Sequence, residues 1–400
     1  MKETDLPLLY LVKIGELVLK GGNRKEFERT LHRNLATMLR GSGAQINDTD
    51  GRIYVHCSKA KAEYVEFCLD HIAGITAWTQ ARSCPKNIED IKKTVLQEAS
   101  TLQKSASFMG ASFKMEARRT DKSFPLNSHE ICCVCADAIL EERRSAESWK
   151  VDIHHPDITF YVEVREKAYI YGVQHKGVRG LPVGTASRGM LLLSGGLDSP
   201  VAGYLMALRG MKINAVYFHS YPYTDDNAKQ KVIDLAKILG AYTMGINLNI
   251  VSLTDIQMKI KDGAPLQWTT VMMRMAMMEI ASVIANIQRC KCLITGESLS
   301  QVASQTIENI VCSESRAELP VMRPLIGTDK EDIIKAAKRI GTYETSILPY
   351  ADCCVLFSPE HPILHGDLKI AGEIYERLNL GALIESAVSK REMEKCSYFG

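Results

Sequence analysis

The sequence has few of the features that mark membrane, secreted or zinc-binding proteins. Its apolar runs are short beside the roughly 20 residues that a membrane-spanning helix needs. The N-terminus carries acidic residues and no small-residue cleavage site, which argues against a signal peptide. The 12 cysteines include adjacent pairs such as Cys132–Cys133 and Cys353–Cys354, whose spacing favours neither a disulfide framework nor structural zinc. We therefore expect a reduced, cytoplasmic protein with no membrane segment and no bound structural metal.

The chain also has little net charge, formally +2 over 400 residues. Residues 1–190 carry 28 Lys and Arg against 24 Asp and Glu, or +4, whereas residues 191–400 carry 21 against 23, or −2. This mild asymmetry permits a nucleic-acid surface in the first half but does not require one. The length predicts two or three domains.

The first half is predicted to contain two α/β modules. Residues 1–77 read as a small β-α-β unit of ferredoxin-like type, and residues 78–175 as a second module. The predicted elements are strands over 8–20 and 52–57, helices over 25–40 and 61–75, a helix over 88–106, a strand over 111–119, a helix over 127–144, and two strands within 150–172 separated by a turn at His154–Asp157. Residues 177–189, with four glycines and a proline, are the best linker candidate.

Regular alternation of strands and helices begins at Met190. Strands are predicted over 190–193, 212–220, 243–249 and 292–296, and helices over 200–210, 226–240 and 269–287. This order predicts an α/β domain over residues 176–400 with a parallel, Rossmann-like sheet, whose ligands bind at the carboxyl ends of the strands. The many methionines of the helix over 269–287 are expected in the core.

The segment SGGLDS, Ser194–Ser199, lies between the first strand of this domain and the next helix. Glycines let backbone N–H groups approach an anion, and the helix N-terminus adds a favourable dipole. No Gly-Lys-Ser/Thr follows, so this is not the common P-loop. Asp198 suits such a site if it shares a Mg²⁺ ion with phosphates or orients the loop. We predict that the segment binds pyrophosphate.

The loop resembles the signature of the PP-loop ATP pyrophosphatases, which cleave ATP to AMP and pyrophosphate while adenylating a substrate. Nearly the whole chain is similar to the tRNA 4-thiouridine synthetase (tRNA uracil 4-sulfurtransferase, ThiI) family. The similar segments are GELVLKGGNRKEFE, FKMEARRTDKSFPLNSHEI, HPDITFYVEVREKAYIY, GLPVGTASRGMLLLSGGLDSPVAGYLMALRG, VYFHSYPYT, TGESLSQVASQTIENI and RPLIGTDKEDII. The resemblance implies a THUMP RNA-binding module over residues 78–175 and a PP-loop ATP pyrophosphatase domain over residues 176–400.

The resemblance also implies the residues of a nucleotide site. Asp198 and Lys330 would be catalytic, with Lys330 offsetting negative charge on the phosphate in the transition state. The nucleotide-binding residues would be Leu192, Leu193, Ser194, Gly195, Gly196, Ser199, Tyr217, Phe218, Arg274, Gly296 and Gln305. Tyr217 departs from the family, which tends to have histidine there. ATP is the expected co-substrate and Mg²⁺ the expected ion.

A cysteine in LPYADCCVLFSP would complete the chemistry. Cys353 matches the family's essential thiol, with Cys354 beside it, and a thiolate there would carry or resolve a persulfide. The chain ends about 45 residues after Cys354, so we expect it to lack the C-terminal rhodanese-like domain of some members. Sulfur would then come from a cysteine desulfurase, from free sulfide, or through another thiol such as Cys396. An iron–sulfur cluster is a further option, although the spacing offers no standard ligand run.

Binding of tRNA is assigned to the first half, by shape and by phosphate contacts. The basic residues of the similar segments are Lys20, Arg24, Lys25, Arg118, Arg119 and Lys122. Phe124 is the one candidate there for stacking on a base. The resemblance also allows a homodimer, and it links the family to sulfur supply for the thiazole ring of thiamine.

The predicted function is an ATP-dependent tRNA sulfurtransferase that adenylates uridine 8 at O4 and replaces that oxygen with sulfur. Two alternatives remain open. One is another PP-loop ligase that modifies tRNA with a different nucleophile, and the other is a non-catalytic RNA-binding protein with a degenerate nucleotide site. Pyrophosphate release with tRNA and the mass of the product would separate the three.

Overall fold

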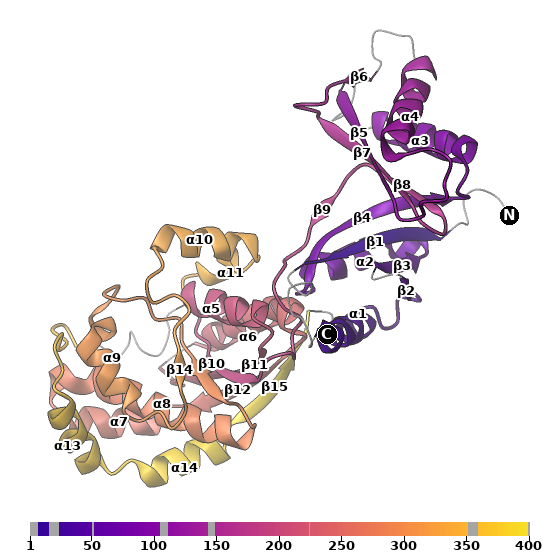
Figure 1. The fold of residues 1–400 in the computed structure, drawn as a ribbon. Helices are drawn as coiled ribbons and strands as arrows, with labels where there is room; N and C mark the ends of the chain where they lie inside the picture. Colours follow the sequence, from indigo (N-terminus) through magenta and orange to yellow (C-terminus); the bar gives the residue numbers. More distant parts are fainter. Residues whose placement is uncertain are drawn as a thin grey trace. The chain divides into compact units, whose positions relative to one another are not determined.

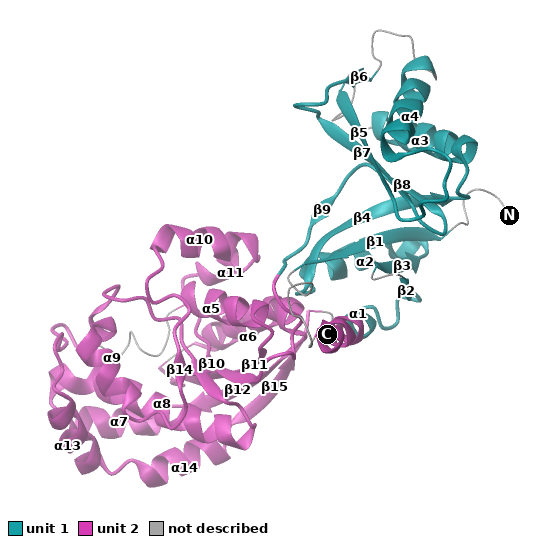
Figure 2. Ribbon diagram, in the orientation of Figure 1, with its two compact units in different colours: residues 1–20, 35–179 teal, residues 21–34, 180–400 magenta. Residues whose placement is uncertain are grey.

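The computed structural model (Figure 1) describes residues 7–15, 24–49, 52–104, 111–142, 149–223, 225–350 and 359–398. The chain divides into two compact units (Figure 2). Unit 1 comprises Met1–Lys20 and Leu35–Arg179, and unit 2 comprises Gly21–Asn34 and Gly180–Gly400. The change of unit at Gly180 lies within the segment predicted as a linker.

The described residues of unit 1 form a nine-stranded sheet with helices packed against it (Figure 1). The strands are β1 (Leu8–Ile14), β2 (Gln45–Thr49), β3 (Arg52–Cys57), β4 (Ile75–Cys84), β5 (Ser112–Arg119), β6 (Lys150–Val151), β7 (Ile158–Val164), β8 (Ala168–Tyr171) and β9 (His175–Lys176). Their order is β2-β3-β1-β4-β8-β7-β5-β6, and β9 also pairs with β4. The helices are α2 (Ala62–His71), α3 (Ile88–Gln103) and α4 (Ser128–Glu142), while α1 (Arg24–Met38) begins in unit 2 and ends in unit 1.

Strand β4 joins the two modules predicted for the first half. It pairs with β1 through Val12↔Trp78 and with β8 through Arg82↔Ile170, both antiparallel. Its sequence, ITAWTQARSC, mixes Thr, Gln, Arg and Ser with apolar residues, so no clean alternation predicts it. The ferredoxin-like and THUMP-like modules therefore share one continuous sheet, and the boundary predicted between residues 77 and 78 lies inside β4.

Two predicted strand limits differ from the structure. Residues 158–172, predicted as one strand, form the antiparallel hairpin β7–β8. The N–H of Arg165 donates to the Lys167 carbonyl oxygen at 2.8 Å to close its turn. The strand predicted over 243–249 starts instead at Ile246, because the preceding helix continues to Thr243. That helix ends at Met244 in the left-handed region, at φ 63°, and Gly245 follows at φ 86°.

Unit 2 contains a six-stranded sheet in its described part, in the order β14-β13-β10-β11-β12-β15. Its strands are β10 (Arg188–Leu192), β11 (Lys212–His219), β12 (Ile246–Ser252), β13 (Cys292–Ile294), β14 (Val321–Met322) and β15 (Glu392–Cys396). The first five are parallel, as predicted, and β15 adds an antiparallel edge strand. The chain runs outward from β10 to β12 and returns on the other side at β13, which places the topological switch point between β10 and β13.

Helices flank this sheet (Figure 1). They are α5 (Asp198–Leu208), α6 (Asp226–Thr243), α7 (Thr254–Gly263), α8 (Thr269–Ile287), α9 (Ile307–Glu314), α10 (Lys330–Arg339), α11 (Tyr343–Ser346), α13 (Leu368–Leu378) and α14 (Gly381–Ser389). The predicted linker is packed against this unit, since Leu181 and Val183 are buried and the Leu181 N–H donates to the Leu208 carbonyl oxygen at 2.8 Å.

Helix α8 forms the centre of the core of unit 2. Its methionines are buried, as predicted: Met272, Met273, Met275, Met277 and Met278. By length and composition, Leu266–Ile287 is the one helical segment in the described chain that would suffice to cross a membrane. However, 67% of its apolar window is buried inside the fold, as is usual for a helix at the centre of a globular core.

Candidate functional site

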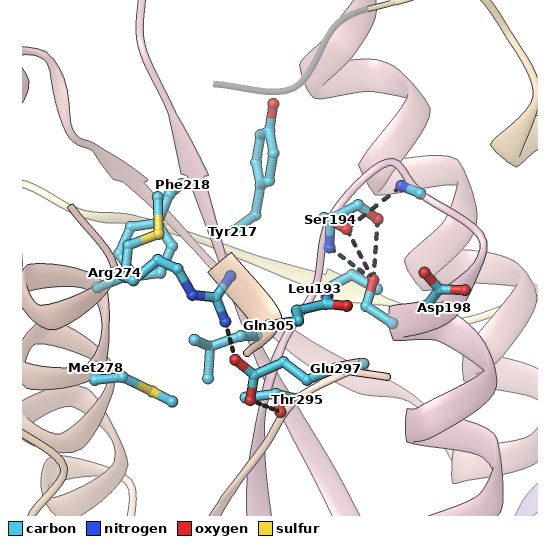
Figure 3. Close-up of a pocket in the computed structure, with 15 residues that line it drawn as sticks. Leu193, Ser194, Asp198, Tyr217, Phe218, Arg274, Met278, Thr295, Glu297 and Gln305 are labelled. Carbon is cyan, nitrogen blue, oxygen red and sulfur yellow. Dashed lines mark hydrogen bonds and ion pairs between the residues drawn. The ribbon is translucent and has the colours of Figure 1, made fainter. Parts of the chain in front are cut away.

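A pocket lies at the carboxyl ends of β10, β11 and β13, beside the switch point (Figure 3). It is lined by Leu192, Leu193, Ser194, Gly196, Asp198, Ser199, Tyr217, Phe218, Arg274, Met277, Met278, Thr295, Gly296, Glu297 and Gln305. The structure thus brings together the residues predicted to bind a nucleotide, with Gly195 between Ser194 and Gly196 in the same loop. Their individual roles stay predictions.

The loop from Ser194 to Ser199 is closed by its own serines. The Ser194 N–H donates to Ser199 Oγ at 2.9 Å, the two hydroxyl oxygens lie 3.1 Å apart, and the Gly196 N–H donates to Ser194 Oγ at 3.4 Å. Helix α5 then begins at Asp198, and the side chain of its N-cap residue Leu197 makes no capping hydrogen bond. Because the first N–H groups of a helix have no partner within it, this start of α5 suits an anion in the pocket.

Gly296 is required by a close approach of two backbone segments. A Cβ at this position would lie 2.7 Å from the Ser199 nitrogen and 2.8 Å from both the Asp198 carbonyl carbon and the Ser199 Cα. The sequence predicts that Gly296 lets a backbone come close. In the structure that backbone is the start of α5. Gly296 therefore lets the loop after β13 pack directly against the end of the Ser194–Ser199 loop.

Asp198 and Lys330 are in direct contact. Lys330 Nζ donates to Asp198 Oδ1 at 2.5 Å, and Gln301 Nε2 donates to the other carboxylate oxygen at 3.3 Å. Lys330 is the first residue of α10, its side chain is 41% exposed, and its partner Asp198 lines the pocket. The two residues predicted to be catalytic are therefore adjacent.

Glu297 and two arginines form an ion-pair cluster at the inner side of the pocket. Glu297 accepts from Arg274 through Oε1, and through Oε2 from Arg323 Nε at 2.7 Å and from Thr295 Oγ1 at 2.8 Å (Figure 3 draws all but Arg323). Burial by itself would raise the pKa of Glu297, but the guanidinium groups of Arg274 and Arg323 outweigh that effect and hold the pKa below its ordinary value. Glu297 is therefore ionised at neutral pH.

Two polar atoms of the pocket are buried without a hydrogen-bond partner in the described chain. They are Arg274 Nε, a donor, and Gln305 Oε1, an acceptor. Buried polar groups almost always have partners, so unpaired ones in a pocket indicate where a ligand supplies them. A nucleotide, with acceptor oxygens on its phosphates and donors on its base, has groups of both kinds.

Several lining residues were not among the predicted ones. Met277 and Met278 follow Arg274 by three and four positions, so helical spacing puts them on its face and could have identified them. Glu297 follows Gly296 just beyond a predicted strand, where polar groups of α/β sites gather. No local signal marks Gln301 or Arg323, because only the tertiary fold brings them to Asp198 and Glu297.

Of the thiols predicted to act in sulfur transfer, the structure describes only Cys396. Cys353 and Cys354 lie outside the described residues, so their predicted role stays a prediction. Cys396 does not suit the second-thiol role, because it is 1% exposed within β15 and paired opposite Ile246. Burial raises the pKa of its thiol to about 11, which leaves very little of the reactive thiolate at neutral pH.

The predicted RNA-binding residues are divided between the two units. Arg24 and Lys25 lie in the first turn of α1, in the part that belongs to unit 2, whereas Arg118, Arg119 and Lys122 lie in unit 1. Lys20 lies outside the described residues. Arg24 forms an ion pair with Glu28 at 2.7 Å.

Within unit 1, two of the side chains predicted to contact RNA interact with other parts of the protein instead. Arg119 Nη1 donates to the carbonyl oxygens of Lys122 and Phe124, at 3.3 and 3.0 Å, so it holds its own loop. Phe124 is 6% exposed and packs in the core under α3 and α4, so the prediction that it stacks on a base is wrong. Arg118 and Lys122 remain exposed.

Three family models match successive parts of the chain. They are described as "ThiI ferredoxin-like domain" over residues 9–78, "THUMP domain" over residues 85–173 and "Thiamine biosynthesis protein (ThiI)" over residues 184–380. The predicted fold class, with a ferredoxin-like module, a THUMP module and a PP-loop domain, is confirmed.

Similar proteins cover the chain almost completely. A "probable tRNA sulfurtransferase" of Treponema pallidum (strain Nichols) is 47% identical over 386 residues, which cover 96% of this chain and 94% of the relative. One of Caldanaerobacter subterraneus subsp. tengcongensis is 45% identical, covering 94% of this chain and 97% of the relative.

Solved structures agree with these relatives. A crystal structure of a 4-thiouridine synthetase–RNA complex with bound ATP matches with a TM-score of 0.89 and 34% identity, over 98% of this chain and 100% of that one. PH1313 from Pyrococcus horikoshii Ot3 matches with a TM-score of 0.62 and 25% identity, over 84% and 99%. This chain belongs to the ThiI family of tRNA sulfurtransferases.

Proposed function

We propose that this protein is an ATP-dependent tRNA sulfurtransferase that converts uridine 8 of tRNA to 4-thiouridine. The observation that carries the proposal is the pocket of unit 2, where the SGGLDS loop, Lys330 and Arg274 meet at one switch point. The ATP bound in the related 4-thiouridine synthetase and the names of the relatives support the same activity.

The pocket has the groups that adenylation needs. The N–H groups at the start of α5 and the side chains of Arg274 and Lys330 would bind the phosphates of ATP, with Tyr217 and Phe218 beside the base. The uracil O4, taken out of the base stack, would attack the α-phosphate, and pyrophosphate would leave. Lys330 would stabilise the charge that builds on the phosphate in that step.

A Mg²⁺ ion fits one side of this pocket. Among the described residues no group of three or more His, Cys, Asp and Glu side chains could hold a metal. Mg²⁺ in nucleotide sites, however, is commonly bound by one or two carboxylates together with phosphate oxygens. Glu297 is 2% exposed and is held by two guanidinium groups, whereas the side chain of Asp198 is 21% exposed. Asp198 is therefore the carboxylate of the pocket lining that would contribute, and the ion would neutralise phosphate charge.

The second half of the reaction would replace AMP by sulfur at C4 of the activated uracil. We assign the thiol to Cys353. The terminal sulfur of a persulfide on Cys353, delivered by a cysteine desulfurase, would attack C4 and expel AMP, and a second thiol would then reduce the resulting disulfide bond to release 4-thiouridine. If the persulfide is carried elsewhere, Cys353 would be that second, resolving thiol. Free sulfide would instead displace AMP directly, with no change of oxidation state. Residues 1–77 and 78–175 would bind the tRNA, with Arg118 and Lys122 the exposed basic candidates on unit 1. The catalytic domain would cover residues 176–400.

The proposal also covers the localisation of the enzyme, its oligomeric state and a second role. We assign it to the cytoplasm, where thiols stay reduced, and allow a homodimer. The description of the family model as a thiamine biosynthesis protein supports a second role in sulfur supply for the thiazole ring.

The test is transfer of sulfur to unmodified tRNA. Purified protein, ATP and tRNA are incubated with sulfide or with a desulfurase and cysteine, and the nucleosides are analysed by mass spectrometry. Pyrophosphate release and a uridine in which sulfur replaces oxygen are expected, both dependent on ATP. Pyrophosphate release with a different modified nucleoside would indicate another PP-loop ligase, and absence of both would indicate an RNA-binding protein without this activity.

A further inference from the structure

Glu297 lines the pocket, yet its side chain is almost completely buried. It follows β13, is 2% exposed, and uses both carboxylate oxygens. A buried carboxylate that is held by two guanidinium groups is poorly placed to bind a metal ion or to move a proton. Its contribution to the pocket must therefore act through the side chains it holds.

One of those side chains is Arg274. Its guanidinium is tied to Glu297 through Nη2, while its Nε is buried with no hydrogen-bond partner in the described chain. Figure 3 shows the guanidinium between Glu297 and the side chains of Phe218 and Tyr217. A long side chain loses rotamer freedom when it binds a ligand, so anchoring it beforehand makes binding stronger.

The other side chains hold Glu297 itself. Arg323, which follows β14, donates to Glu297 through Nε and to Glu314 of α9 through Nη1, each at 2.7 to 2.8 Å. Thr295 adds a third donor. Since β13 and β14 are parallel neighbours, the sheet itself brings Glu297 and Arg323 together at the same edge.

We propose that Glu297 is a positioning residue that fixes the guanidinium of Arg274 in the orientation that meets a phosphate group of the nucleotide. This inference rests on the proposed function of the pocket as an ATP site. Without the carboxylate, Arg274 and Arg323 would face each other as two cations with no anion between them. Arg274 would then be repelled from its present orientation.

The test is a double-mutant cycle between Glu297 and Arg274. The variants are Glu297→Gln, Arg274→Met and the double variant, assayed for ATP affinity by calorimetry and for KM and kcat of tRNA-dependent pyrophosphate release. Glu297→Gln is expected to weaken ATP binding and to raise KM by about 10-fold or more, the range for a buried charge-assisted hydrogen bond. On the Arg274→Met background the same substitution is expected to change either value by less than about 2-fold.

The chain offers a matched control in Glu314. It bonds the same Arg323, yet its side chain is 43% exposed and it does not line the pocket. Glu314→Gln is expected to leave ATP affinity within about 2-fold of the wild type, because exposed ion pairs contribute little. Thermal unfolding of every variant reports on stability separately.

The outcomes separate this inference from the proposed function. The positioning role would be overturned if the fold-changes of the two single variants multiply in the double variant. It would also be overturned if Glu297→Gln binds ATP with wild-type affinity. If Glu297→Gln does not fold, Glu297→Asp replaces it in the cycle; it keeps the charge but shortens the reach, and the same non-additivity is required of it. A wild type that binds ATP but releases no pyrophosphate with tRNA would refute the proposed function while leaving the calorimetric cycle valid.

Discussion

Substitution of Gly296 by alanine tests whether the close contact between the loop after β13 and the start of α5 matters for activity. The added Cβ would meet three backbone atoms of Asp198 and Ser199 at 2.7 to 2.8 Å, where ordinary contacts lie near 3.5 Å or beyond. Backbone atoms cannot move aside as a flexible side chain can, so the two segments must separate by roughly 0.5 to 1 Å. Overpacking of this kind costs about 1–3 kcal/mol.

The substitution is expected to lower both stability and activity. At about 2–4 °C per kcal/mol for a domain of 150–250 residues, the unfolding temperature should fall by roughly 2–12 °C. Misplacement of reacting groups by about 1 Å can cost about 10²-fold in rate, so tRNA-dependent pyrophosphate release should fall by about that factor.

Gly372→Ala is the matched control for this substitution. A Cβ at Gly372, within α13, meets nothing within 4 Å, so this variant should be neutral or more stable by about 0.5–1 kcal/mol. Differential scanning calorimetry and a single-turnover pyrophosphate assay measure both properties. If Gly296→Ala unfolds at the wild-type temperature and reacts at the wild-type rate, the argument from backbone contact is refuted.

Three further predictions follow from the site and from unit 1. Lys330→Met should lower the rate of pyrophosphate release by about 10²–10³-fold, with little change in unfolding temperature because the side chain is 41% exposed; a wild-type rate would exclude its role in charge stabilisation. With a desulfurase and cysteine as the sulfur source, Cys353→Ser should keep pyrophosphate release and lose 4-thiouridine, whereas the buried Cys396→Ser should keep both; nucleoside mass spectrometry checks this, and thiolation by Cys353→Ser would show that another thiol acts. Burial by itself would raise the pKa of Glu163, but Arg52, Tyr171 and Arg165 hold it below the ordinary value. The stabilisation from Glu163 is therefore present at neutral pH and lost progressively as the pH falls below the ordinary glutamate pKa of 4.5, because the unfolded chain then binds more protons. In urea unfolding the stability difference between wild type and Glu163→Gln should thus shrink on acidification, and a constant difference would contradict the argument.

The parts of the site that are contiguous in sequence were predicted well. SGGLDS follows a run of leucines and precedes a helix, and this local order is enough to indicate an anion-binding loop. Glu297, Arg323 and Gln301 were not predicted, because their partners lie on other strands and helices. Phe124 shows the opposite error, since an aromatic residue among basic ones suggested a binding surface, but it fills the core under α3 and α4.

The fold shows the same division. The parallel sheet of unit 2 was predicted because its strands are continuous apolar runs separated by helices of regular period. Strand β4 was not, because its side chains meet different environments along its length and so show no single alternation. The start of β12 was placed too early. The left-handed residue that ends α6 is Met244, and methionine is not a residue type from which a left-handed conformation is predicted.

Because β4 pairs with both β1 and β8, the choice of boundary matters when fragments of this protein are expressed. A fragment cut between residues 77 and 78 would retain β1 but lose most of the strand that pairs with it. The complementary fragment would keep the residues of β4 that pair with β8 but lose β1, the other neighbour of that strand. Each fragment would then present an open strand edge, which invites pairing with other chains and aggregation. The N-terminal half should accordingly be expressed and unfolded as a single cooperative body, and a soluble isolated THUMP module is not to be expected from a boundary placed inside that strand.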